Sequence, residues 1–123
     1  MAAIAYSEAI RRRAAKAENR GRLAAPTHAA CWGNPGRGPF MLLHLGAERG
    51  RIARVLFDAN DCPVAIACGS ALAELVQGRA LAELHALGRE DITRLVGVVP
   101  AGKTYCLDVA AELIARIARR GSV

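Results

Sequence analysis

The feature that most constrains this chain is a hairpin pattern over residues 40–57. Its first arm, 40–45, is apolar on both faces, with His44 as the one polar exception. A strand of that kind is central in its sheet or faces a partner. A turn at 48–50 leads to a second arm, 51–57, which is again rich in apolar residues. The pattern therefore predicts an antiparallel β-hairpin.

Helical patterns stand on both sides of this hairpin in the sequence. Ser7 is a suitable cap for a helix that begins at Glu8, and Pro63 is favoured in the first turn of a helix that follows Cys62. Helices are expected at 63–77, 80–87, 91–96 and 105–119. This order predicts an α+β fold, a small antiparallel β-sheet with helices packed on one face.

The length of 123 residues and the apolar fraction of 53% fit one folded domain over 1–123. Its expected parts are an N-terminal helix (1–19), a loop (20–39), a β-hairpin (40–57) and a helical half (62–120). No apolar stretch reaches the roughly 18 residues of a membrane span, so no membrane contact is expected. At the N-terminus the apolar residues precede the arginines of 11–13, the reverse of a secretory signal, which makes a cytoplasmic location the expectation.

The net charge of +6 is compatible with nucleic acid or with an acidic protein partner. Aromatic residues make up only 4% of the chain, too few for a base-stacking platform, so nucleic acid is not the expected partner.

The chain has four cysteines and no CxxC pair, which disfavours a zinc ribbon or finger. Cys62 stands at the start of one predicted helix and Cys106 near the start of another. The N-terminus of a helix favours a thiolate, the form that binds iron or zinc or accepts sulfur. Cys62 and Cys106 are therefore the expected metal or sulfur residues, with Lys103 near the second of them.

Three stretches carry a resemblance to a known family. Residues 33–41 read GNPGRGPFM, similar to the word G-x-P-x-C-G-D-x-M. Residues 57–70 read FDANDCPVAIACGS, similar to F-x-x-x-G-C-x-x-x-I-A-S-S-S. Residues 100–110 read PAGKTYCLDVA, similar to P-P-x-K-x-H-C-x-x-x-A. In this order the three words resemble the IscU/NifU-type iron–sulfur cluster scaffold family, and the resemblance implies that family's fold.

The resemblance places Cys62 and Cys106 at two of the family's three cysteine positions. The first cysteine position holds Arg37, the aspartate position Pro39 and the histidine position Tyr105. A cluster usually takes four ligands, and arginine cannot ligate iron.

Several alternatives would supply the missing ligands. One candidate replacement ligand is Cys31 in the predicted loop, and another is the phenolate of Tyr105. Alternatively, the two protomers of a homodimer would share a cluster. The apolar Phe40 and Leu42 leave room for such a dimer. Arg37 would alternatively bind an anion near the two thiolates. Cys68 is expected to be a packed core thiol.

By resemblance, the expected function is iron–sulfur cluster assembly by a scaffold or iron/sulfur carrier, not an enzyme. Its cargo is a transient cluster or iron, and a cysteine desulfurase is the expected sulfur donor. The family's chaperone-binding word Pro-Pro-x-Lys is here PAGK, and Ala101 weakens the expectation of a chaperone partner. One alternative is a degenerate member without a cofactor that acts as a binding or regulatory protein. A weaker alternative is a zinc-bound sulfur acceptor.

Overall fold

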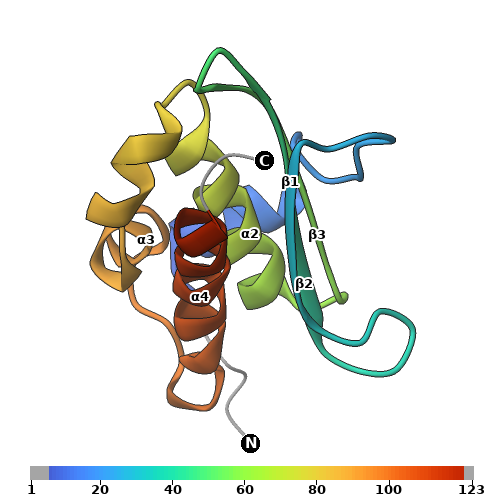
Figure 1. Cartoon of the computed structure of the whole chain (residues 1–123). Coiled ribbons are helices and arrows are strands. Elements are labelled where there is room, and N and C mark those ends of the chain that lie inside the picture. The colour runs from blue at the N-terminus through green and yellow to red at the C-terminus, as the bar shows by residue number, and fades with distance from the viewer. Residues whose placement is uncertain (1–5, 121–123) are drawn as a thin grey trace, which may run out of the picture.

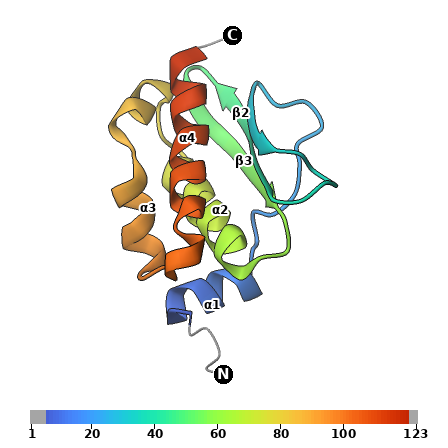
Figure 2. The ribbon, with the colours of Figure 1, turned by 90° about the horizontal axis from the view of Figure 1, so that it is seen from below.

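The computed structural model describes residues 6–120. In chain order the helices and strands are α1 (Glu8–Ala15), β1 (His28–Gly33), β2 (Phe40–Glu48), β3 (Arg51–Ala59), α2 (Pro63–Val76), α3 (Arg89–Val96) and α4 (Tyr105–Arg120). Short 3₁₀ turns lie at Leu81–Ala86 and Ala101–Lys103. The expected α+β fold is confirmed, because the helices lie on one side of the sheet (Figures 1 and 2).

The sheet has three antiparallel strands in the order β1-β2-β3. The central strand is β2, which explains why its sequence is apolar on both faces. Met41, Leu43 and Leu45 belong to the main hydrophobic core together with residues of the helices, whereas Leu42 is buried outside that core. Alternate residues of a strand point to opposite faces, so Leu42 lies on the face turned away from the helices.

The helical layer approaches the sheet closely where α2 crosses β3. A Cβ atom added to Gly69 would lie 2.2 Å from Cδ2 of Phe57, a residue that is fully buried. Glycine therefore allows the helix backbone to rest directly on the aromatic ring.

The sequence prediction of one loop over 20–39 is wrong in its middle, because residues 28–33 form β1. The alternation of this strand is hard to read from sequence, since Ala29, Ala30 and Gly33 give little contrast between its faces. The backbone groups of residues 28–33 form their hydrogen bonds with β2, whereas the predicted loop gave these groups no partners.

The segment before β1 covers the face of the sheet that the helices leave free. The backbone N–H of Leu23 donates to Nδ1 of His44 at 3.1 Å, and the guanidinium of Arg22 lies 5.9 Å from the ring centre of Phe40. Leu42 is only 4% exposed as a result. The apolar surface on which a dimer contact was expected is therefore covered within the chain.

Ser7 caps α1 as predicted, since its hydroxyl accepts the N–H of Ile10. The same hydroxyl donates to the carbonyl of Val96 at 2.6 Å and so joins α1 to the end of α3. Within residues 6–120, no helix is long and apolar enough to cross a membrane.

Candidate functional site

Three sequence motifs lie close together at one end of the sheet. They are the motifs of residues 33–41, 57–70 and 100–110. The β1–β2 loop, the turn from β3 into α2, and the start of α4 all lie at the lower end of the molecule in Figure 1. Antiparallel pairing causes this arrangement, because β2 begins at the edge where β3 ends. Positions far apart in sequence thus become neighbours around Cys62 and Cys106.

Cys62 is the N-cap residue of α2 and is 8% exposed. Its carbonyl accepts the N–H of Ile66, and its own N–H donates to the carbonyl of Asn60 at 2.7 Å. Pro63 follows at the first helical position, where its missing N–H costs nothing. Local sequence therefore makes Cys62 the capping residue at which α2 begins.

Cys106 is the second residue of α4 and is 1% exposed. Burial raises the pKa of its thiol to about 11, and the nearby Cys62 adds to the effect. Tyr105 and Lys103 act in the opposite direction but do not outweigh burial. The expectation that the start of the helix favours a thiolate is therefore wrong for Cys106, since burial dominates.

Lys103 lies beside both thiols, at the end of the 3₁₀ turn that precedes α4. Negative charge on Cys62, then on Tyr105, raises the pKa of its ammonium. The structure thus brings Cys62, Lys103 and Cys106 together, as the sequence words imply.

Tyr105 packs between the start of α4 and the sheet. Its ring centre lies 6.0 Å from that of Trp32, at an interplanar angle of 40°. Burial, followed by the neighbouring Cys106, raises the pKa of its hydroxyl. A cavity of about 10 Å³, room for one water at most, lies beside the two rings. Its lining consists of Trp32, Phe40, Met41, Asn60, Ala65, Tyr105, Cys106 and Val109.

Arg37 and Pro39 lie on the exposed β1–β2 loop. The N–H of Arg37 donates to the carbonyl of Asn34, which closes the turn. Within the described part of the chain, the Arg37 side chain forms no hydrogen bond or ion pair. The loop thus leaves this cation free near the thiol end of the sheet.

The other two cysteines are placed differently. Cys31 lies on β1 opposite Leu42, so it shares the face turned away from α2 and α4. Cys68 lies inside α2 and is fully buried, and burial raises its pKa to about 12. Cys31 therefore stands on a strand rather than in the loop from which it was expected to reach the site.

The ligand count within one chain is low. Across residues 6–120, no group of three or more histidine, cysteine, aspartate or glutamate side chains is placed to hold a metal ion. Cys62 and Cys106 provide two thiolates, and a four-ligand site needs two more donors.

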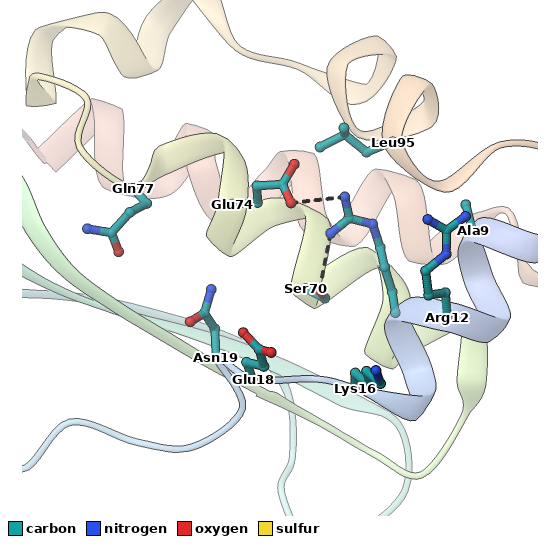
Figure 3. Close-up of a pocket in the computed structure, with 10 residues that line it drawn as sticks. Ala9, Arg12, Lys16, Glu18, Asn19, Ser70, Glu74, Gln77 and Leu95 are labelled. Atoms are coloured by element: carbon teal, nitrogen blue, oxygen red, sulfur yellow. Dashed lines mark hydrogen bonds and ion pairs between the residues drawn. The ribbon is translucent and has the colours of Figure 1, made fainter.

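A larger hollow lies elsewhere, a groove of about 670 Å³ between α1 and α2 (Figure 3). The guanidinium of Arg13 crosses it to Ser70 and Glu74, at 3.2 and 3.1 Å. Arg13 therefore ties the two helices together. Because this cation is already paired and the groove contains no thiol, the candidate site is assigned to Cys62 and Cys106 and not to the groove.

Sequence reasoning left out two residues that shape the site, Arg20 and Asn60. The side chain of Arg20 bonds to the turn before Cys62, and the amide of Asn60 bonds to the start of β2. Arg20 stands far from this turn in sequence, and no spacing rule would have linked them.

Residues 5–119 match the NifU-like N terminal domain family. The iron-sulfur cluster assembly scaffold protein IscU 1 of Archaeoglobus fulgidus is 29% identical over 84 residues, covering 68% of this chain and 55% of that protein. The nitrogen fixation protein NifU of Cereibacter sphaeroides is 45% identical over 64 residues, covering 52% of this chain and 26% of that protein. The chain therefore spans about half, or less, of these curated relatives.

Solved structures agree in fold. A nitrogen-fixing NifU-like protein (N-terminal) from Brucella abortus superposes with a TM-score of 0.56 at 23% identity, covering 92% of this chain and 80% of that one. A candidate iron-sulfur cluster assembly scaffold for the SUF system from Fervidobacterium islandicum AW-1 gives 0.69 at 14% identity, covering 92% and 96%. The chain belongs to the NifU-like N terminal domain family.

Proposed function

We propose that this protein acts in iron–sulfur cluster assembly as a scaffold or iron/sulfur carrier, with Cys62 and Cys106 as the residues that hold the cargo. The observation that carries the proposal is the meeting of these two thiols with Lys103 at one end of the sheet. The family membership and the names of the relatives point in the same direction.

One chain provides half of the thiolate ligands that an iron–sulfur cluster usually takes. Iron–sulfur clusters usually take four thiolates, and one chain offers Cys62 and Cys106. Two chains would offer four thiolates without help from Cys31. We therefore propose that a cluster is held between two copies of the chain, in a ratio of one cluster to two chains.

Sulfur would arrive as a persulfide on a cysteine desulfurase. The thiolate of Cys62 would attack the outer sulfur of the donor persulfide, the donor S–S bond would break, and the donor cysteine would leave as a thiolate. The ammonium of Lys103 lies where it stabilises negative charge on the accepting sulfur. The protein is then an acceptor and carrier rather than an enzyme with turnover.

One observation favours a second candidate, a binding or regulatory protein without a cluster. Arg37 replaces a ligand of the family and stays free and exposed in the described part of the chain. A free cation on a loop at the same end of the sheet as the two thiols suits an anionic partner group. The zinc alternative needs four ligands in a closed site, of which one chain supplies two thiols.

Anaerobic reconstitution with iron and sulfide tests the proposal. Wild type is compared with Cys62→Ser, Cys106→Ser and Cys31→Ser by visible absorption and by iron and sulfide counts per chain. We expect cluster absorption in wild type and Cys31→Ser, and its loss in the other two variants. Absence of a cluster in every sample would favour the binding protein. Stoichiometric zinc in the purified protein would favour the zinc alternative.

A further inference from the structure

The turn that carries Cys62 is held by an arginine from a distant part of the sequence. Nη2 of Arg20 donates to the carbonyl of Ala59 at 2.8 Å and to Oδ1 of Asp61 at 3.0 Å. Nε of the same side chain donates to Oδ1 of Asp58 at 3.1 Å. One guanidinium therefore spans residues 58–61, the last two residues of β3 and the two that follow it, which end directly before Cys62. We call this segment the 58–61 turn.

The backbone around Arg20 is fixed as well. The N–H of Phe57 donates to the carbonyl of Asn19 at 2.9 Å, and the N–H of Gly21 donates to the carbonyl of Phe57 at 2.7 Å. Arg20 thus pairs in parallel with the outer edge of β3. The guanidinium reaches the turn from an anchored position, which lowers the entropy lost in forming its hydrogen bonds.

The three contacts of the Arg20 guanidinium differ in how much each one stabilises the turn. The side chain of Asp61 is 93% exposed, and an ion pair of that kind contributes little. Asp58 is only 22% exposed. Burial opposes its ionisation, yet hydrogen bonds from Arg20 and from the N–H of Ala59 keep the pKa of Asp58 below its usual value. The bonds to Asp58 and to the carbonyl of Ala59 are the ones that hold the turn.

A second contact holds the other side of the same turn. Oδ1 of Asn60 accepts the N–H of Phe40 at 3.2 Å, and the N–H of Asn60 donates to the carbonyl of Phe40 at 3.3 Å. The carbonyl of Asn60 in turn accepts the N–H of Cys62. The turn is therefore clamped between β2 and Arg20, and the thiol is placed by both.

We propose that Arg20 is a positioning residue for Cys62, because its guanidinium fixes the 58–61 turn and so sets where the Cys62 thiol stands relative to Cys106. The inference rests on the proposed function for its use, since a pair of thiols binds one cargo only when both are held in place.

Hydrogen exchange tests the clamp without any cargo. Arg20→Gln is compared with Arg20→Lys and with the matched control Arg22→Gln. Among residues 6–120, Arg22 bonds to this segment only through Asp58, at 3.4 Å. We expect amides of 58–66 to exchange about tenfold faster in Arg20→Gln, since charge-assisted bonds are lost from a local opening unit. Arg20→Lys keeps the charge without the fork and should be intermediate, while Arg22→Gln should match wild type.

Binding of Co²⁺ tests positioning. In a Cys31→Ser background, the thiolate-to-cobalt absorption band is titrated in wild type and in Arg20→Gln. We expect about tenfold weaker Co²⁺ binding in Arg20→Gln, with the thermal midpoint nearly unchanged, because the thiol pair is no longer pre-organised. Arg20→Lys should recover part of the affinity. If Arg20→Gln fails to fold, Asp58→Asn loosens the same turn and should shift both readouts in the same direction by less.

The outcomes separate the two proposals. Unchanged exchange at 58–66 in Arg20→Gln would overturn the clamp, and so would an equal increase throughout 105–120. Faster exchange with unchanged Co²⁺ affinity would also overturn positioning. If wild type binds neither Co²⁺ nor a cluster while exchange responds as expected, the clamp stands and the cluster assembly proposal fails.

Discussion

Tyr105 lies with its ring against Trp32, at 6.0 Å between ring centres, and so joins the first residue of α4 to β1. Aromatic pairs at this spacing contribute beyond their buried area. The pKa of the Tyr105 hydroxyl is raised, first by burial and then by Cys106, so the phenolate that would bind iron is disfavoured. The ring of Tyr105 therefore packs the start of α4 against β1.

This relationship predicts different results for two substitutions at Tyr105. Tyr105→Phe keeps the ring, so we expect unchanged iron and sulfide per chain after reconstitution and a stability change below about 1 kcal/mol. Tyr105→Ala removes the pair and should lower the free energy of unfolding by about 2 kcal/mol in urea titrations. Loss of the cluster in Tyr105→Phe would instead give the phenolate a ligand role.

Gly69→Ala tests the contact between α2 and β3. The added methyl group would meet the ring of Phe57 at 2.2 Å, and overpacking of this kind costs about 1–3 kcal/mol. Gly102→Ala is the matched control, because a Cβ atom there meets nothing within 4 Å. Its unfolding free energy should stay within about 0.5 kcal/mol of wild type. Equal urea midpoints for both variants would contradict the close approach.

The buried thiols predict a loss of stability in alkali. Burial raises the pKa of Cys68 to about 12 and that of Cys106 to about 11, whereas a thiol in the unfolded chain titrates near about 8.5. Their stabilising contribution is therefore fully present below about pH 8.5 and is lost as the pH rises toward the folded values.

Urea unfolding at graded pH, under reducing conditions, measures this effect. The free energy of unfolding should fall above about pH 8.5, and the fall should be less steep in Cys68→Ala, which lacks one of the titrating groups. Parallel pH curves for wild type and Cys68→Ala would show that Cys68 is not the buried thiol described here.

Cys31 should behave as a surface thiol without a role in the site. It is exposed on β1, on the face turned away from the helices, whereas the other three cysteines are buried. Limited alkylation followed by peptide mass spectrometry should modify Cys31 first at neutral pH, with Cys68 and Cys106 slowest. Faster modification of Cys106 than of Cys31 would contradict its burial.

Much of the fold could be predicted because its patterns are local. Ser7, Pro63 and the glycine after α2 mark helix ends through the chemistry of single residues. The two-sided apolar pattern of β2 correctly indicated a central strand. By contrast, β1 is rich in alanine and glycine and carries little periodic signal, so its pairing with β2 depends on contacts that a local pattern does not record.

The site divides in the same way. The sequence motifs correctly predicted that Cys62, Lys103 and Cys106 lie close together. Each of these residues stands next to the recognisable start of a helix. The raised pKa of the Cys106 thiol could not be foreseen, since it follows from burial by distant segments. The role of Arg20 depends on a contact across the fold for the same reason. That a cluster forms with Arg37, Pro39 and Tyr105 at the family's ligand positions stays a prediction.

Native mass spectrometry of the anaerobically reconstituted protein tests whether Cys62 and Cys106 of two chains hold one cluster. Wild type, Cys62→Ser and Cys106→Ser are measured side by side, with Cys31→Ser as control. We expect two chains with one cluster in wild type and in the control, and only free chains in Cys62→Ser and Cys106→Ser. A cluster on a single chain, or one that survives both serine substitutions, would contradict this expectation.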